Sequence, residues 1–213
     1  MRGALALAAL LAAMPGCADV VDDLPAGASM VDAPRWTGGR WWNYTIEDGG
    51  GAAMGWINHT VIVERPVANV TERGWEVQTL RFDLGDVDHD GAPNQTVARD
   101  VLYDAATLNS VWNVCGTPYV FGACSGRDPE LDFPLWDGKR WASRSGGDVI
   151  IDYDNRAFRA THEGRAVWRV EREALGVTGW PAEVSLYDPA VGFYVERVHP
   201  GFADETWRLR SWG

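Results

Sequence analysis

The sequence predicts a mainly β protein, with a single antiparallel sheet curled into a half-barrel-like meander of about 10–12 strands. Apolar and polar residues alternate through most of the chain after residue 35, where helical periodicity is hard to find. Clusters of turn-forming residues, such as 48–51 and 145–147, separate the alternating runs. Two pairs of phrases also recur in matching order, which indicates a degenerate two-fold repeat.

The first 16 residues predict an export signal of the lipoprotein type. Arg2 gives a basic start, and residues 4–14 form an apolar run that is too short to span a bilayer as a helix. The run ends at Gly16-Cys17, which resembles the bacterial and archaeal lipoprotein signal whose cysteine is acylated. We therefore expect Cys17 to anchor the protein to a membrane, at the cell surface or in the cell envelope. The alternative is ordinary cleavage, which would release a soluble secreted protein.

Two further segments follow the signal. Residues 17–35 are acidic and hold little that could pack, so they predict a flexible tether. Residues 36–213 are long enough for one well-buried domain. The repeated phrases divide this domain into halves of about 36–130 and 131–213. The formal net charge of the chain is −11, which repels polyanions and excludes nucleic acid as a partner.

The repeat is carried by two short phrases. Residues 36–41 and 136–141 both read Trp-x-Gly-x-Arg-Trp and lie 100 positions apart. Leu-Tyr-Asp occurs at 102–104 and again at 186–188. The glycines permit tight corners, and we expect each Trp phrase to lead into a strand.

The alternating runs predict the strands in order. They cover residues 56–64, 75–84, 149–153, 166–170, 184–186, 193–198 and 207–209. In the second run the apolar phase changes near Thr79, which indicates a bulge. Residues 188–192 read Asp-Pro-Ala-Val-Gly and predict a hairpin loop.

The chain contains 12 tryptophans. A ring of exposed indoles could bind sugar or lipid, whereas indoles with apolar neighbours on the same strand face fill a core. Most of them lie in alternating runs, which favours the core.

The cysteines other than Cys17 form one candidate pair, Cys115 and Cys124. Export would place them in an oxidising compartment, and the glycines and proline between them can form a turn. We expect a structural disulfide.

Four asparagines lie in Asn-x-Thr triplets, namely Asn43, Asn58, Asn69 and Asn94. Exported proteins of many hosts carry N-glycans at such triplets. Strand composition is the alternative explanation, because threonine is favoured in strands and alternation places it two residues on.

An acidic loop is the sharpest chemical motif. Asp86, Asp88 and Asp90 stand at alternate positions before Gly91, as in the opening of a calcium loop, and Asn94 falls at a further ligand position. The bidentate glutamate of an EF-hand is replaced by Val97, and strands flank the motif. A weak calcium site and a solvated loop without metal are the two interpretations.

Two phrases in the second half resemble those of a family of uncharacterised secreted β-proteins and lipoproteins. These phrases are Phe-Pro-Leu-x-x-Gly-x-x-Trp at 133–141 and Tyr-Asp-Pro-x-x-Gly at 187–192. The family resembles the LolA/LolB lipoprotein carriers. The resemblance implies a half-barrel sheet with an apolar concavity, and it identifies no catalytic residue.

Three functions follow as hypotheses. The first is a lipid-anchored surface protein that binds an apolar or amphipathic small molecule, or an envelope protein, in the hollow of its sheet. The second is a purely structural envelope module whose hollow is filled by its own tryptophans. The third is a glycan-acting hydrolase that uses Asp152 or Asp154 with Glu163 as paired carboxylates. Scattered histidines argue against a zinc site, and the sequence favours a protein that is not an enzyme.

The calcium hypothesis predicts a stability change. Millimolar calcium should raise the melting temperature of the wild type by a few degrees, because the ion binds only the folded loop. Asp88→Ala should remove this response. The measurement is thermal unfolding with calcium or with EGTA, and equal melting temperatures in the wild type would refute the site.

Overall fold

The computed structural model describes residues 25–66, 73–87, 93–105, 108, 110–112, 126–128, 130–145, 151–179, 181–199 and 204–213. These residues form fourteen strands and no helix. The predicted β class is therefore confirmed. No described segment forms a helix of the length and hydrophobicity that a membrane span needs.

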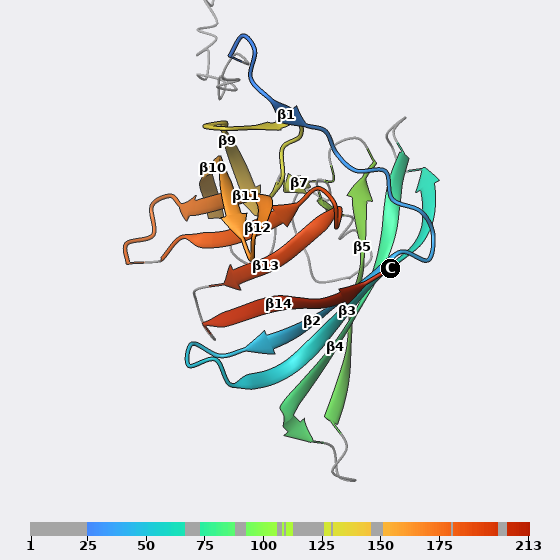
Figure 1. The fold of residues 1–213 in the computed structure, drawn as a ribbon. Helices are drawn as coiled ribbons and strands as arrows, with labels where there is room; N and C mark the ends of the chain where they lie inside the picture. The colour runs from blue at the N-terminus through green and yellow to red at the C-terminus, as the bar shows by residue number, and fades with distance from the viewer. Residues whose placement is uncertain are drawn as a thin grey trace, which may run out of the picture.

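Twelve strands form one antiparallel sheet that stays open (Figure 1). The first half is a meander of β2 (Trp41–Glu47), β3 (Ala53–Pro66), β4 (Arg73–Val87), β5 (Pro93–Asp104), β6 (Ser110–Trp112) and β7 (Gly126–Asp128). The second half is a meander of β9 (Arg140–Ser145), β10 (Ile151–His162), β11 (Arg165–Ala174), β12 (Glu183–Asp188), β13 (Phe193–His199) and β14 (Glu205–Trp212). The predicted curled meander is confirmed.

The halves are joined where β14 pairs with β2, so the strand order runs 9-10-11-12-13-14-2-3-4-5-6-7. In the sheet, the first strand of the first half, β2, thus lies beside the last strand of the second half, β14. At the opposite side β7 and β9 approach each other, but the described residues form no ladder between them. The arrangement is a head-to-tail pair of meanders with one closed seam and one open seam.

The first Trp-Gly phrase makes a tight corner before β2. The N–H of Arg40 donates to the carbonyl of Thr37 at 3.1 Å, and Gly39 has a φ of 85°, which favours glycine. Gly39 donates to the carbonyl of Val61 at 2.7 Å, and Val61 donates back to the carbonyl of Arg40 at 2.8 Å. The corner is thereby fixed to β3.

The second phrase makes the same corner before β9. Lys139 donates to the carbonyl of Trp136 at 3.1 Å, and Gly138 has a φ of 85°. Gly138 donates to the carbonyl of Ala157 at 2.8 Å, and Ala157 donates back to that of Lys139 at 2.9 Å. The structural counterparts are Gly39 with Gly138, Arg40 with Lys139, and Trp42 with Trp141. The two corners are equivalent in structure. The sequence alignment that pairs Trp36 with Trp136 is therefore wrong by one residue, because the backbone hydrogen bonds pair Thr37 with Trp136.

A cation braces each corner. The guanidinium of Arg40 lies 5.6 Å from the ring centre of Trp42 and donates to the carbonyl of Val191 at 2.7 Å. The ammonium of Lys139 lies 4.4 Å from the ring centre of Trp136 and forms an ion pair with Asp132 at 2.7 Å. Lys139 is 5% exposed, so this cation–π contact is largely desolvated.

The Leu-Tyr-Asp phrases also occupy equivalent places. Asp104 ends β5 and Asp188 ends β12, and both side chains are buried. Each aspartate carbonyl accepts an N–H from four residues on, Leu108 or Gly192, at 2.8 Å. The tyrosine before each aspartate faces a tryptophan on the neighbouring strand, in the pairs Tyr103–Trp75 and Tyr187–Trp168.

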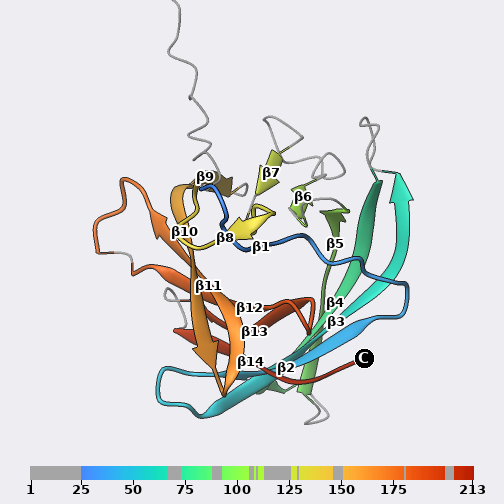
Figure 2. The same cartoon turned by 45° about the horizontal axis from the view of Figure 1, so that its top comes forward.

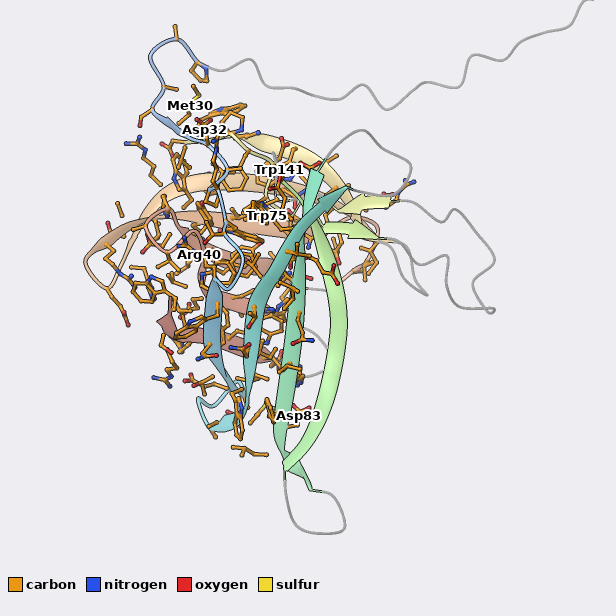
Figure 3. All side chains as sticks on the ribbon, turned by 90° about the vertical axis from the view of Figure 1, so that its right-hand side faces the viewer. Met30, Asp32, Arg40, Trp75, Asp83 and Trp141 are labelled. Atoms are coloured by element: carbon orange, nitrogen blue, oxygen red, sulfur yellow. The ribbon has the colours of Figure 1, made fainter. Side chains whose placement is uncertain are left out.

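Aromatic side chains fill the concave face where the halves meet. Trp36 is 2% exposed and contacts the rings of Trp42, Tyr103 and Phe193 at centroid distances of 5.0, 5.5 and 5.4 Å. Its indole nitrogen donates to the carbonyl of Gly192 at 2.9 Å. The core assignment of the tryptophans is confirmed for Trp36, Trp42, Trp75, Trp136, Trp141 and Trp168. Figure 3 places Trp75 and Trp141 within this filled interior, and Asp83 at the far end of β4.

The predicted bulge near Thr79 lies in the partner strand. The register between β4 and β5 shifts between Val77 and Thr79, and the extra residue belongs to β5. Alternation along β4 therefore continues unbroken, and Phe82 and Leu84 lie on the outer face. Phe82 stacks on Trp56 at 5.1 Å, and Trp56 and Leu84 are 40% and 45% exposed.

Part of the predicted tether belongs to the folded domain. β1 (Met30–Val31) pairs with β8 (Leu135–Trp136), and Val31 and Ala33 pack against the core. We call residues 25–36 the strap. It crosses the open side of the curled sheet before Trp36 enters the interior (Figure 2).

Gly55 supplies a stability test of the sheet. A β-carbon at residue 55 would lie 2.1 Å from the carbonyl oxygen of Phe82, so Gly55→Ala must push β3 from β4. We expect a loss of about 1–3 kcal/mol in urea unfolding. Gly49→Ala is the matched control, because its nearest neighbour lies 3.6 Å away. Equal stability of the two variants would contradict the close approach.

Candidate functional site

A group of charged side chains lies on the inner face of the second half, beside the aromatic core. We call it the inner charged layer; its members are Glu130, Arg172, Glu183, Arg197 and His199. Alternation sets the inward direction, since Arg172 follows buried Trp168 and Val170 on β11. Arg197 of β13 lies on the same face, because its cross-strand partner Ser185 is also the partner of buried Val170. Glu130 comes from the connection between β7 and β8.

The two arginines and two glutamates alternate in a ring. Glu130 lies 2.9 Å from Arg197 and 3.4 Å from Arg172. Glu183 lies 3.5 Å from Arg172 and 3.8 Å from Arg197. The arginine side chains are only 5% and 12% exposed, while Glu130 is 24% exposed. Each arginine thus lies near both carboxylates, which lowers the cost of burying the four charges.

Aromatic and polar groups surround the ring. The hydroxyl of Tyr194 donates to Glu130 at 3.2 Å. The guanidinium of Arg172 lies 4.2 Å from the ring centre of Tyr153, and that of Arg197 lies 5.8 Å from the ring centre of Trp207. Both guanidinium groups are therefore held by aromatic faces as well as by carboxylates.

The layer has a neutral counterpart in the first half. Arg172 pairs with Asn155 across β11 and β10, and the equivalent pair in β4 and β3 is Thr79 with His59. The ring nitrogen Nδ1 of His59 and the hydroxyl of Thr79 are 2.7 Å apart. Asn155 donates to Ser143 at 2.9 Å. Both halves thus place a polar pair at the same depth, and only the second half carries charge there.

A second ion-pair group extends the layer toward the end of β4. Arg81 forms ion pairs with Glu205 at 2.6 Å and with Asp83 at 2.8 Å. Glu205 also accepts a hydrogen bond from the indole of Trp207 at 3.2 Å. Charged side chains therefore continue on the inner face beyond the aromatic core.

The environment moves the pKa values of this region away from neutrality. Burial alone would raise the pKa of Glu130, but Arg197 and Arg172 outweigh it and lower that pKa to about 2. Burial and the charge of Arg197 lower the pKa of His199 to about 3. The same causes lower the pKa of His59 to about 3. At neutral pH Glu130 is ionised and both imidazoles are neutral, so none of the three is suited to general acid–base catalysis near pH 7.

Several buried polar atoms of the layer have no hydrogen-bond partner among the described residues. They are Arg197 Nε, Glu183 Oε2 and His199 Nε2. A buried donor or acceptor without a partner is costly, and such atoms mark places where water or a ligand can bind. The layer is therefore the strongest candidate for a binding site in the described part of the chain.

The calcium motif lies at the hairpin between β4 and β5. Asp88 and Asp90 lie outside the described residues, while Asp86 and Asn94 fall within β4 and β5, where only their backbone is described. Across the described residues, no group of three or more His, Cys, Asp or Glu side chains could hold a metal. Calcium stays a prediction.

Two of the four Asn-x-Thr asparagines face each other. Asn43 of β2 and Asn58 of β3 are cross-strand partners, and the amide of Asn58 donates to the side-chain oxygen of Asn43. Asn69 lies outside the described residues, and only the backbone of Asn94 is described. Glycosylation stays a prediction, as do acylation of Cys17 and the Cys115–Cys124 disulfide, whose residues lie outside the described ranges.

The proposed carboxylate pair of a hydrolase is wrong in its geometry. Asp154 and Glu163 are nine residues apart along β10 and its turn, which is about 30 Å at the rise of a strand. Paired glycosidase carboxylates lie less than about 10 Å apart. Asp152 and Asp154 are each occupied by an arginine, Arg144 at 2.6 Å and Arg140 at 2.6 Å.

The comparisons with known proteins identify no family. Neither protein-family models nor curated proteins match the sequence. One solved structure is similar over 87% of this chain and 100% of its own, with 11% identity and a TM-score of 0.42. It is a Bacteroides fragilis protein, proposed to be exported, with a YmcC-like fold. Similarity of this size supports no functional argument.

The buried histidines predict acid destabilisation. Their folded pKa values lie below the ordinary 6.5, so their contribution to stability is full above pH 6.5 and falls as the unfolded state takes up protons below it. Between pH 6.5 and 5 the wild type should lose about 1.5 kcal/mol more than His59→Asn, which carries the counterpart residue. Urea unfolding at the two pH values measures this. Parallel pH profiles of the two proteins would rule out a buried neutral His59.

Proposed function

We propose that the chain is an exported protein, held at the cell surface by an acyl group on Cys17, and that its β domain is a structural module of the cell envelope. The observation that supports this most directly is Trp36. This residue comes from the strap and fills the concave face that a ligand carrier would leave open.

The energy of burying Trp36 argues against a lipid-binding cavity in the concave face. Removing a buried tryptophan typically costs roughly 3–5 kcal/mol, and an apolar ligand in its place would have to exceed that cost. Trp36 also donates to the carbonyl of Gly192 at 2.9 Å, a bond that an apolar ligand could not replace. The LolA/LolB resemblance implies an apolar concavity, and the chain's own side chains already occupy one.

The electrostatics argue in the same direction against an enzyme. Glu130, His59 and His199 have pKa values far from neutrality. Of the carboxylates in the hydrolase hypothesis, Asp152 and Asp154 form ion pairs on β10, and Glu163 lies far from Asp154. A structural module needs neither a reactive group nor an open hollow. Binding of an apolar molecule or an envelope protein in the hollow remains the alternative, and it requires Trp36 to leave.

Purification from the native host tests the proposal. We expect wild-type protein in the membrane fraction and Cys17→Ser in the soluble fraction, because only the acyl chains anchor it. Native mass spectrometry should give the acylated polypeptide with no further lipid. Wild type in the soluble fraction would contradict the anchor. A stoichiometric bound lipid would contradict the filled interior and favour the carrier.

A further inference from the structure

A small cleft lies where the β10–β11 turn meets β13 and β14, away from the inner charged layer. Six of the side chains that line it are charged or titratable, namely His162, Glu163, Arg165, Glu196, Arg208 and Arg210. The cleft has room for several water-sized groups. Small polar groups at one end of a ligand can therefore enter it.

The arginines of the cleft are already paired with acids. The ion pairs are Arg165–Asp188 at 3.1 Å, Arg208–Glu47 at 2.8 Å, Arg210–Glu47 at 3.2 Å and Arg208–Glu196. An anionic ligand would meet these acids, and Glu163 adds one more negative charge. A cationic ligand would lie against three guanidinium groups. Because like charges side by side are unfavourable, the cleft favours an uncharged ligand that offers hydrogen bonds.

Glu163 occupies a turn position that suits another residue. Its φ is 50° and that of Gly164 is 77°, as in the two-residue hairpin turn that favours Asn-Gly. Glutamate is uncommon in this left-handed region. Its side chain has no hydrogen-bond or ion-pair partner among the described residues. A strained residue with an available carboxylate beside a cleft favours a binding role over a stabilising one.

The outer face of the sheet continues from the cleft to an exposed tryptophan. Arg208 follows inward-facing Trp207, so alternation turns it outward. Arg208, Thr45 and Trp56 are successive cross-strand partners on β14, β2 and β3, and their side chains share one face. Arg210 Nε donates to the Thr45 hydroxyl at 2.8 Å, which ties this row to the cleft. Two strand spacings, about 10 Å, separate Arg208 from Trp56.

The indole of Trp56 turns one face toward the cleft. Its other face stacks on Phe82 of β4, with ring centres 5.1 Å apart and an angle of 17° between the planes. That separation is close to the spacing of neighbouring strands, so the two rings stand side by side across the sheet. The remaining face of the indole is therefore directed to β2 and the small side chain of Thr45. Trp56 is 40% exposed, so a flat apolar surface follows the polar cleft.

We propose that the cleft and Trp56 form a binding site for an uncharged oligosaccharide on the outer face of the sheet. A sugar carries hydroxyls that both donate and accept hydrogen bonds, and its ring has apolar C–H faces. Hydroxyls of one sugar enter the cleft, where they donate to Glu163 and accept from the guanidinium groups. The next sugar lies over Thr45 against the indole of Trp56. The site is on the opposite face of the sheet from Trp36, so it depends neither on the filled interior nor on the acyl anchor.

Titration of the wild-type protein with cellobiose, maltose and diacetylchitobiose, followed by NMR, tests the site. At least one disaccharide should bind saturably, and Trp56→Ala should weaken that binding about tenfold or more, because the stacking face is lost. Leu175→Ala is the matched control and should bind as the wild type does. Leu175 is 52% exposed and lies at the other end of β11 from Arg165. No saturable binding of any of the three probes, unchanged affinity in Trp56→Ala or an equal loss in Leu175→Ala overturns the proposal.

Glu163→Asn separates binding from folding. Asparagine adopts the left-handed turn conformation more readily, so this variant should melt at the same temperature as the wild type or higher. It should bind the disaccharide about fivefold or more weakly, because the shorter, uncharged side chain loses its bond to a hydroxyl. Unchanged affinity in this variant overturns the proposal. So does competition by sodium sulfate beyond that of sodium chloride at equal ionic strength, which would reveal an anion site.

Discussion

The ladder between β14 and β2 is the contact on which the rest of the fold depends. Trp41 and Gly213 exchange two backbone hydrogen bonds, at 2.9 and 3.1 Å, and the pairing continues through Trp212–Trp42 to Trp207–Ile46. Among the described residues it is the one strand ladder that joins the two meanders. The aromatic core draws Trp42 and Tyr44 from one meander and Phe193 and Trp207 from the other, and this ladder brings the two sets of rings together. Loop-closure entropy opposes such a distant pairing, and burial of the shared aromatic surface must offset it.

The concave face is divided between two kinds of packing. Aromatic rings and Trp36 fill the part near the corners, whereas arginines and glutamates occupy the adjoining part of the second half. Buried ion pairs add little net stability compared with apolar residues of the same volume, yet losing one partner costs about 3–5 kcal/mol. The first half shows that a neutral pair, His59 with Thr79, satisfies the equivalent position. Stability alone therefore does not explain the charges of the inner charged layer.

Alternation and repeated phrases were enough to predict the β class, the open meander and the inward tryptophans, because period-two patterning is a direct record of which face is buried. The register of the repeat could not be predicted. Trp36 and Trp136 match in sequence, but backbone hydrogen bonds align Gly39 with Gly138. The inner charged layer was missed although its signal was present, since continuing the alternation of Trp168 and Val170 places Arg172 inward. Glu130 carried no such signal, because a connection has no periodicity and only the folded chain brings it to Arg197.

The brace at Lys139 has a consequence for chemical labelling of this protein. Lys139 is the only lysine of the sequence, and its ammonium is buried between Asp132 and the ring of Trp136. Amine-directed reagents need a free, deprotonated nitrogen at the surface, so the folded corner shields the one ε-amine from them. Modification at this position therefore measures how often the corner opens. The rate of modification reports the opening of this corner alone, because the equivalent residue at the other corner, Arg40, does not react with amine-directed reagents.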